Sequence, residues 1–393
     1  MPHTRNLRLS QLAPGSVQSE IRSMSLACDL AGGINLAQGI CDTEVPAPVL
    51  AEAKAAMEDG RNIYTRLDGI QRLRNAIAAD ASRRHGVPVD ANTQVLVTSG
   101  ATGAFHATCM ALLDPGDEVI VFEPFYGYHL GTLKSLRMQP VIVALEDGAG
   151  LATWELNVDA LRKAVTPRTR AILINTPSNP AGKVFTRAEL EAIGAVGEEH
   201  DLFLITDEIY EHFIYEGAEH ISPISLPGLR ERTIVMSGFS KTYSITGWRV
   251  GYLLADAKWI PSIGYFHDMT FICAPAPAQH GAAAGLEQLP PSFYTSLAAD
   301  HLIKRDMLLA ALRDAGLTPH TPQGAYYILA KTHGLNGANA AQKARDLLAR
   351  TGVAAVAGSA FFRAGKGEDL LRFCYGKTYS ALKEACDRIR SLR

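Results

Sequence analysis

Short apolar runs alternate with amphipathic stretches through the middle of the chain. The runs rich in β-branched residues are Val95–Thr98, Val119–Phe122, Val141–Leu145, Ala171–Asn175, Leu202–Thr206, Thr233–Met236 and Val250–Leu254. The stretches with helical spacing between them include Gly103–Leu113, Tyr128–Arg137, Val158–Val165 and Arg187–His200. Strands that alternate with helices form largely parallel sheets covered on both faces. The pattern therefore predicts an α/β fold with a mostly parallel seven-stranded sheet.

The alternation ends near Leu289-Pro290-Pro291, and a smaller α+β unit is expected beyond it. Its predicted elements are a long helix at Phe293–Ala315, strands at Gly324–Ala330, Val353–Ala357 and Leu370–Tyr375, and helices at Ala338–Arg350 and Ser380–Leu392. Before the alternation we expect helices at Ser19–Ala31, Val49–Glu58 and Gln71–His85, with a strand entering Gly39. A chain of 393 residues suggests more than one domain. We predict an N-terminal arm with the first part of a small domain (1–46), a large domain (47–292) and a C-terminal small domain (293–393).

Composition narrows the possible partners. Apolar residues make up 47% and charged residues 20% of the chain, as in soluble globular proteins. A net charge of −2 gives no electrostatic case for binding nucleic acid or an anionic membrane. The six cysteines contain no C-x-x-C pair, which favours a reduced, cytoplasmic protein and gives no reason to expect a metal site. We expect neither a secretory signal nor a membrane span.

Candidate site residues follow the predicted strands, and the carboxyl ends of parallel strands meet at one edge of a sheet. They are Gly100, Ala101 and Thr102 after the first strand, Tyr126 after the second, Asn179 after the fourth, and Asp207 and Tyr210 after the fifth. Peptide N–H groups at a helix start bind phosphate, and an aromatic ring can stack on a planar ligand. Each motif alone also fits an ordinary role: a tight turn, a core aromatic, an Asn-Pro turn or a capping aspartate.

The most specific stretch is the loop from Ser237 to Gly251, which places Lys241 between two predicted strands. A lysine held in a pocket can lose its proton and attack carbonyls. Arg249 lies eight positions later. It would suit a phosphate, because a guanidinium can donate two parallel hydrogen bonds to phosphate oxygens. The alternative is a solvated Lys241 and an ion-paired Arg249.

The order of these motifs resembles one family. S-G-A-T-G, P-x-Y, N-P-x-G, D-E-x-Y, S-K and R follow one another as in the class I/II aminotransferases of fold type I, the aspartate aminotransferase superfamily. The resemblance covers essentially the whole chain. It implies that pyridoxal 5'-phosphate is the cofactor, that residues 47–292 bind it, and that the small domain is built from both chain ends.

The resemblance also implies a role for each motif residue. Lys241 would form a Schiff base with the cofactor, and Asp207 would keep the pyridine nitrogen protonated. Tyr210 and Asn179 would bind the phenolic oxygen, and Tyr126 would stack on the ring. The phosphate would lie on the backbone of Gly100, Ala101 and Thr102, with Ser240 and Arg249 as side-chain partners.

Three further residues are implied outside those loops. Arg372, in Leu371-Arg372-Phe373-Cys374-Tyr375, matches the arginine that clamps the substrate α-carboxylate, with Gly39 beside it. Tyr64 matches the tyrosine that reaches the phosphate of the neighbouring subunit's cofactor, which implies a homodimer. Two departures stand out: Gly238 replaces a serine that some relatives use on the phosphate, and Cys41-Asp42-Thr43 stands where P-D-F is usual at the substrate mouth.

We therefore predict a ping-pong transaminase that moves an amino group from an L-amino acid to a 2-oxo acid. The nearest subgroup is the kynurenine/glutamine/methionine transaminase type. Because no second arginine is evident for a side-chain carboxylate, a neutral or aromatic donor is favoured over aspartate. Two alternatives remain: a β-lyase of cysteine conjugates on the same fold, and a non-catalytic regulator that keeps the cofactor fold.

Overall fold

A computed structural model of the chain describes residues 7, 9–10, 12–13, 19–148, 154–215 and 217–392. Most of the segment 1–18, on which the predictions of an N-terminal arm and of no secretory signal depend, lies outside these residues. No helix in the described ranges combines the length and the apolar character that crossing a membrane would require.

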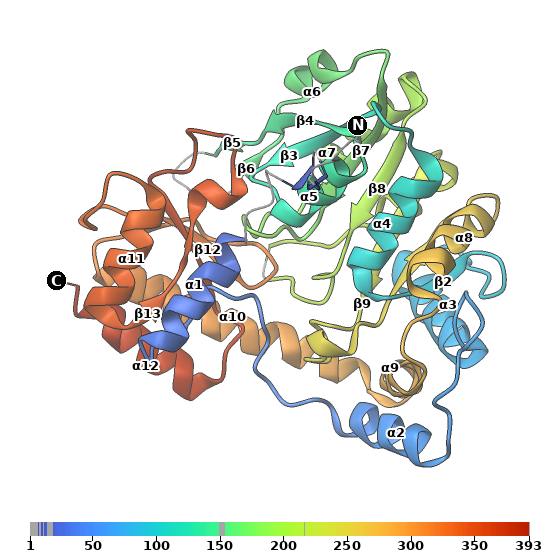
Figure 1. Cartoon of the computed structure of the whole chain (residues 1–393), viewed down its shortest axis with the longest axis horizontal. Coiled ribbons are helices and arrows are strands. Elements are labelled where there is room, and N and C mark those ends of the chain that lie inside the picture. Colours follow the sequence, from blue (N-terminus) through green and yellow to red (C-terminus); the bar gives the residue numbers. More distant parts are fainter. Residues whose placement is uncertain are drawn as a thin grey trace, which may run out of the picture.

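A seven-stranded sheet forms the centre of the molecule (Figure 1). Its strands, in spatial order, are β2 (Val95–Thr98), β10 (Gly251–Leu254), β9 (Thr233–Gly238), β8 (Phe203–Asp207), β7 (Thr169–Asn175), β3 (Glu118–Glu123) and β4 (Gln139–Ala144). β10 runs antiparallel to both of its neighbours, and the remaining pairs are parallel. The predicted mostly parallel seven-stranded sheet is confirmed.

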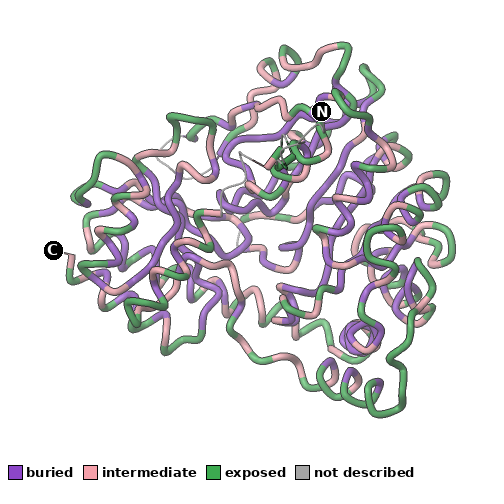
Figure 2. The backbone as a smooth tube through the Cα atoms, in the orientation of Figure 1, coloured by how far each residue is buried: buried purple, intermediate pink, exposed green. Residues whose placement is uncertain are grey.

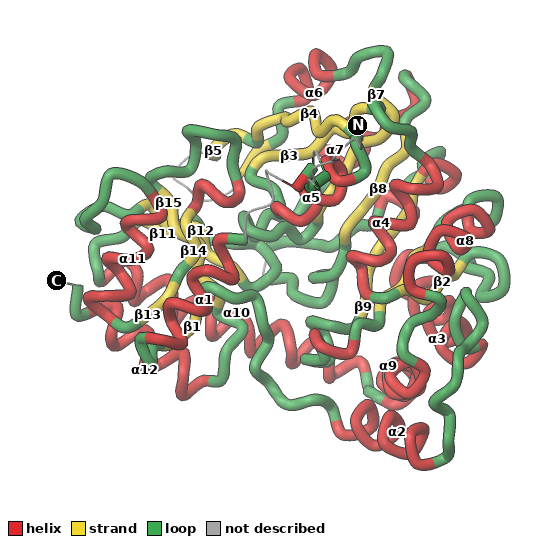
Figure 3. The backbone as a smooth tube through the Cα atoms, viewed as in Figure 1, coloured by secondary structure: helices red, strands yellow, loops and turns green. Residues whose placement is uncertain are grey.

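The strands are buried on both faces because alternate residues enter different cores. In β9, Ile234 and Met236 pack with α4 (Gly100–Leu112) and α8 (Ile260–Phe271), whereas Val235 packs with α3 (Gln71–His85) and α9 (Ala276–Gln288). In β7, Ile172 and Ile174 pack against α6 (Val158–Ala164) and α7 (Arg187–Glu199). Helices therefore cover the sheet on both sides (Figure 3), and Figure 2 shows its strands, apart from the edge strand β4, as almost continuously buried.

A smaller α+β unit lies beside the large sheet. Its four-stranded sheet has the order β11 (Thr318–Pro319), β12 (Tyr327–Lys331), β15 (Leu370–Cys374) and β14 (Val356–Ala357). Beside it, β1 (Ile34–Asn35) pairs in parallel with β13 (Val353–Ala354), so both ends of the chain build this unit. The remaining helices are α1 (Glu20–Leu30), α2 (Ala47–Glu58), α5 (Gly127–Ser135), α10 (Pro291–Asp314), α11 (Ala340–Thr351) and α12 (Tyr379–Arg390).

Helix α10 connects the two units (Figure 1). Phe293 and Tyr294 near its start pack against the core around α9, whereas Leu308 and Leu312 belong to the core of the small unit. One helix therefore contributes to both cores, and the boundaries 1–46, 47–292 and 293–393 stay predictions.

The structure also contains elements that the pattern did not predict. α8 and α9 were missed, as was a short hairpin of β5 (Glu146–Asp147) and β6 (Trp154–Glu155). α9 contains Gly281 and Gly285, which are poor helix formers. A Cβ on Gly285 would lie 2.6 Å from the ring of Tyr243, and one on Gly281 would lie 2.6 Å from the carbonyl oxygen of Val49. Close packing therefore requires these glycines and overrides their low helix propensity.

Two strand boundaries differ for local reasons. β12 starts at Tyr327 rather than Gly324, because Ala325 has a φ of 57°, outside the strand region. The predicted strand Val353–Ala357 is divided, with β13 paired to β1 and β14 paired to β15.

Candidate active site

A cavity of about 380 Å³ lies at the carboxyl edge of the large sheet. Its walls come from the loops after β3, β7, β8 and β9, from the N-terminal segment, and from β12 and β15. The predicted residues that line it are Gly39, Ala101, Thr102, Tyr126, Asn179, Asp207, Tyr210, Ser240, Lys241, Arg249 and Arg372. Gly100 lies beside them as the first residue of α4. Residues far apart in the chain thus meet where parallel strands end.

Lys241 lies in the turn that follows β9. Its Nζ donates a hydrogen bond to the carbonyl oxygen of Gly39 over 2.9 Å. Burial lowers the pKa of the ammonium to about 8, because the charged form loses its hydration. No carboxylate of the described residues lies within ion-pair distance of it. A buried lysine of this kind carries more free amine near neutral pH than an exposed lysine does, and can act as a nucleophile.

Asp207 closes β8 and is buried. Its Oδ2 lies 3.0 Å from Nε2 of His129, and its Oδ1 accepts the peptide N–H of Ile209 over 3.2 Å. His129 was missed at the sequence level. Its position in α5, three residues after Tyr126 and close behind a strand end, was the available signal. Two donors therefore orient a buried carboxylate toward the cavity.

The start of α4 and Arg249 form one end of the cavity. The peptide N–H groups of Ala101 and Thr102 have no hydrogen-bond acceptor within the described parts of the chain. Gly100 has a φ of 70°, and a Cβ there would lie 2.5 Å from Nη2 of Arg249. Helix-start N–H groups beside a guanidinium are a binding site for an anion. Unlike the other loop residues, Arg249 precedes a strand, β10.

Aromatic residues form the walls of the cavity. The ring of Tyr126 stacks on that of Tyr128, with their centroids 5.3 Å apart. The hydroxyl of Tyr210 lies 2.7 Å from the hydroxyl of Tyr327, and burial raises the pKa of Tyr210 well above its usual range. Tyr210 is therefore a neutral hydroxyl at physiological pH. Tyr327 is a further wall residue whose role the sequence did not predict.

Arg372, on β15, is almost fully buried. Its Nη1 donates to Oδ1 of Asn179 over 2.9 Å, and its Nη2 donates to the carbonyl of Ala37. The guanidinium carbon lies 4.4 Å and 4.7 Å from the ring centroids of Tyr327 and Phe361. Nε has no hydrogen-bond partner in the described structure. A buried, positioned guanidinium of this kind suits a carboxylate ligand.

The unusual Cys41 loop packs next to the Lys241 turn. Cys41 Sγ lies 3.8 Å from Nε2 of His301 and 3.3 Å from Oγ1 of Thr43, and Thr43 in turn bonds Ser244. Nδ1 of His301 donates to the carbonyl of Leu297, so Nε2 faces the thiol. Burial acts to raise the pKa of Cys41, but the His301 contact and the two hydroxyls outweigh it and lower the pKa to about 7.

Tyr64 lies elsewhere. It is 76% exposed in the loop between α2 and α3 and does not line the cavity. Within this chain the structure does not bring it to the other predicted residues.

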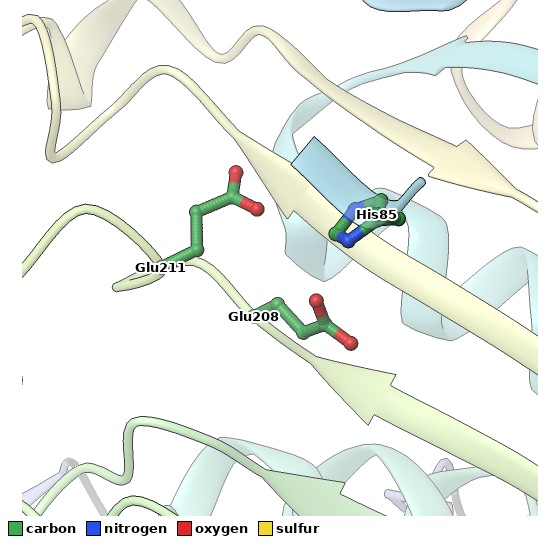
Figure 4. A group of neighbouring side chains, drawn as sticks. All are labelled: His85, Glu208 and Glu211. Atoms are coloured by element: carbon green, nitrogen blue, oxygen red, sulfur yellow. The ribbon is translucent and has the colours of Figure 1, made fainter. Parts of the chain in front are cut away.

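Behind Asp207, a second polar cluster joins His85 at the end of α3 to two glutamates in the turn after β8 (Figure 4). Glu211 accepts hydrogen bonds from Arg84, Ser237 and Tyr252. Glu208 accepts from Thr206 and Ser222, and it also contacts His220. Protein donors thus occupy both carboxylates, and the Arg84 guanidinium would repel a cation. We assign this cluster to the support of the turn that carries Asp207 and Tyr210.

Comparisons with known proteins agree with this geometry. The family model "Aminotransferase class I and II" matches residues 31–389. A probable N-succinyldiaminopimelate aminotransferase of Mycobacterium tuberculosis is 35% identical and covers 98% of both chains. The solved structure of N-succinyldiaminopimelate aminotransferase from that species superposes with a TM-score of 0.94 at 34% identity, over 98% of this chain and 100% of the other.

Two other relatives act, by their names, on different substrates. An Escherichia coli structure identified with a methionine aminotransferase function gives a TM-score of 0.93 at 31% identity, over 98% of this chain and 100% of that one. Kynurenine–oxoglutarate transaminase 3 of Mus musculus is 32% identical over 91% of this chain and 84% of its own. The family match, the fold and the arrangement of the cavity lead to one conclusion: the chain belongs to the class I and II aminotransferases and transfers amino groups.

Proposed function

We propose that the cavity binds pyridoxal 5'-phosphate, the cofactor that the family implies. The residues present fit this group at every point. The N–H groups of Ala101 and Thr102 lack acceptors and lie at the Arg249 end, where a phosphate needs donors. Gly100 leaves room that a Cβ would fill. Asp207 offers a buried carboxylate to a ring nitrogen, and the Tyr126 ring offers a flat surface.

When bound, the cofactor supplies a carbonyl carbon for the amine and a ring that accepts the electron pair released at the substrate Cα. Lys241 Nζ, partly unprotonated near neutral pH, would be the amine that holds this group and would carry the proton removed from the substrate Cα. Asp207 holds a proton at the ring nitrogen, with His129 and the Ile209 N–H fixing its orientation. Ser240 and Arg249 would bind the phosphate, and Tyr210 and Asn179 would donate to the phenolic oxygen.

Arg372 orients the substrate by its α-carboxylate, beside the backbone of Gly39. The substrate then lies with its Cα toward Lys241, which already contacts the Gly39 carbonyl. The same site serves both half-reactions in turn, first with an L-amino acid and then with a 2-oxo acid. That alternation is the ping-pong scheme.

We infer a neutral or aromatic L-amino acid as donor. Ile21, Ile40 and Tyr128 line the cavity and offer apolar contact to a side chain. The relatives act, by their names, on methionine, kynurenine and N-succinyldiaminopimelate, which differ most in the group beyond Cα.

We also propose a cytoplasmic homodimer in which Tyr64 reaches the cofactor phosphate of the partner's site. Tyr64 does not line the cavity of its own chain. Its neighbour Ile63 is 79% exposed, as expected for an apolar residue that a partner subunit would cover. All six cysteines are free, as a reducing compartment favours. The domain division 1–46, 47–292 and 293–393 belongs to the same proposal. Light scattering of the purified protein tests the dimer.

The convergence of Lys241, Asp207, Arg249 and Arg372 on one cavity carries the proposal. The test supplies pyridoxal 5'-phosphate and a panel of amino donors, with pyruvate or 2-oxoglutarate as acceptor. We expect formation of new amino acids that needs both substrates. Release of pyruvate and ammonia from a cysteine conjugate alone would instead identify a β-lyase, and no reaction with any pair would contradict the proposal. A strong preference for aspartate over neutral donors would contradict the donor class.

A further inference from the structure

The segment 39–43 contacts the Lys241 turn at two points. At the first, the carbonyl oxygen of Gly39 accepts a hydrogen bond from Lys241 Nζ over 2.9 Å. At the second, Oγ1 of Thr43 forms a hydrogen bond with Oγ of Ser244, three residues beyond the lysine. Neither Thr43 nor Ser244 belongs to the described lining of the cavity, so the proposed function gives this second contact no role.

The Lys241 turn ends on a residue in a disfavoured conformation. Ser244 has a φ of 57°, in the left-handed region that a Cβ disfavours and that glycine adopts freely. The peptide N–H of Ile245 donates to the carbonyl of Ser240 over 3.1 Å, and that of Ser244 donates to the carbonyl of Lys241 over 3.4 Å. This pair of bonds closes a helical turn on a left-handed residue, which is most often glycine. The turn therefore requires a conformation that serine does not favour by itself.

Thr43 is held in place by contacts outside the Lys241 turn. Its Oγ1 lies 3.3 Å from Sγ of Cys41, and that sulfur lies 3.8 Å from Nε2 of His301 on α10. Between them, Oδ2 of Asp42 pairs with Nζ of Lys377, just beyond β15, over 3.0 Å. The position of Thr43 is therefore set by α10 and the small unit, and the Ser244 hydroxyl bonds to a fixed partner.

The contact also depends on residues that depart from the family pattern. P-D-F is usual where this chain has Cys41-Asp42-Thr43. A phenylalanine side chain has no hydrogen-bonding atom, so it could not bond the hydroxyl of Ser244. The resemblance to the family therefore does not account for this contact, which follows from the threonine in this chain.

We propose that Thr43 is a positioning residue for Lys241. Its hydroxyl holds Ser244 in the left-handed conformation that ends the turn, and the turn in this form brings Lys241 Nζ to the Gly39 carbonyl and the cavity. This inference rests on the proposed function, in which Lys241 is the reacting amine. Thr43 acts on the lysine through Ser244. Without the contact, the turn relaxes and water reaches the amine.

The first test measures kcat and KM of the holoenzyme. Thr43→Val keeps the shape of the side chain and removes the hydroxyl, whereas Thr43→Ser keeps the hydroxyl. We expect kcat to fall roughly tenfold to a hundredfold in Thr43→Val, with KM for donor and acceptor changed less than about threefold. Thr43→Ser should keep most of the wild-type kcat.

The matched control is Thr233→Val. Thr233 is a buried threonine at the start of β9, at the other end of the strand that precedes the Lys241 turn. Its hydroxyl donates to the carbonyl of Leu229 over 2.8 Å, so the variant also loses a buried hydrogen bond. We expect its kcat and KM to stay close to those of the wild type.

The second test repeats Thr43→Val in a Ser244→Gly background. Glycine adopts the left-handed conformation without a steric cost, so the turn no longer needs the Thr43 hydroxyl. We expect the effect of Thr43→Val on kcat to shrink to less than about threefold there. An equal loss of kcat in both backgrounds would overturn the inference. A loss confined to KM would also overturn it, because Thr43 would then act on the substrate.

The third test needs no turnover. Acetylation of Lys241 in the apoproteins, followed by mass spectrometry across pH, gives the midpoint of its titration. Burial lowers the pKa of Lys241 from 10.5 to about 8, and the midpoint should rise toward 10.5 in Thr43→Val but not in Thr233→Val. An unmoved midpoint in Thr43→Val contradicts the inference. A wild type that transaminates with no donor and acceptor pair refutes the proposed function instead, and this midpoint can still be measured.

Discussion

Arg372 donates a hydrogen bond from Nη1 to the amide oxygen of Asn179 over 2.9 Å, although 193 positions separate them. The bond fixes which way the amide faces: its oxygen is committed to Arg372, and its nitrogen donates to no described residue. A donor for the phenolic oxygen of the cofactor is therefore oriented by the residue that we propose to hold the substrate. The proposed positions of the substrate and the cofactor would thus be linked through this hydrogen bond.

Arg372→Lys should reduce kcat/KM for every amino donor by roughly a hundredfold or more, because lysine cannot grip a carboxylate with two parallel donors. The loss should appear with neutral and acidic donors alike. Steady-state kinetics over a donor panel checks this, and urea unfolding checks that the fold is kept. A loss confined to acidic donors would reassign Arg372 to the side-chain subsite.

His129→Ala should leave Asp207 with the Ile209 N–H as its one remaining described donor. We expect kcat to fall roughly tenfold to a hundredfold, as is typical when the partner of a site group is removed. The pH at which the bound cofactor's absorbance changes should also move, and His129→Gln should restore part of both. Normal absorbance titration together with low activity would point to a general packing defect instead.

Lys241→Met should make the apoprotein more stable relative to wild type at pH 7 than at pH 10.5. The pKa of Lys241 falls from 10.5 when unfolded to about 8 when folded, so the unfolded chain binds more protons between these values. The free energy of unfolding of the wild type therefore rises with pH through that window. The expected rise is about 3 kcal/mol, since each pKa unit corresponds to about 1.4 kcal/mol. Urea unfolding of both apoproteins measures the difference.

The matched control is Lys258→Met, whose lysine side chain is 49% exposed. A pH-dependent difference of the same size in this variant would show that the effect does not come from the burial of Lys241. The Lys241 variant should in addition show no turnover, and normal turnover would refute its assignment as the nucleophile.

Gly100→Ala should weaken cofactor binding at least tenfold, because the new Cβ would meet the Arg249 guanidinium at 2.5 Å. Gly86 is a close match in backbone strain: its φ is 68° against 70° for Gly100, but no atom lies within 4 Å of the position that a Cβ would take there. Both variants should lose about 1 kcal/mol of stability from the left-handed backbone. Cofactor titration followed by fluorescence should separate them.

Cys41 should titrate near pH 7, whereas burial raises the pKa of Cys386 to about 11. Alkylation by a small reagent, followed by mass spectrometry across pH, gives the midpoint for each thiol. His301→Phe removes the ring nitrogen that faces the sulfur and should raise the Cys41 midpoint toward 9 while Cys386 stays unchanged. An unmoved Cys41 midpoint would exclude His301 as the cause.

Much of the fold and of the cavity followed from local pattern. β2 and α3 have the predicted bounds, and the strand ends carry Asn179, Asp207 and Lys241 into one cavity, as parallel topology requires. These features depend on periodicity and on residues adjacent in sequence. A short stretch of sequence is therefore enough to predict them.

What could not be predicted depends on contacts between distant segments. His129 can contact Asp207 because β3 lies two strands from β8 in the sheet. Arg22 lines the cavity because α1 packs on the small unit. Helix α9 contains glycines because Tyr243 and Val49 pack too closely against it to leave room for a Cβ. None of these relations leaves a repeat or a motif in the sequence.

β1 pairs with β13 through Ile34–Val353 and Asn35–Ala354. This pairing of early and late residues bears on the order in which parts of the enzyme can fold during synthesis. The seven-stranded sheet is complete once Leu254 has been synthesised, and we expect it to form during translation. The segment with Gly39, although made early, has no strand partner until residue 354 leaves the ribosome. Lys241 therefore lacks the carbonyl that later holds it while residues 242–354 are synthesised, and the pocket becomes competent only as the last elements are added.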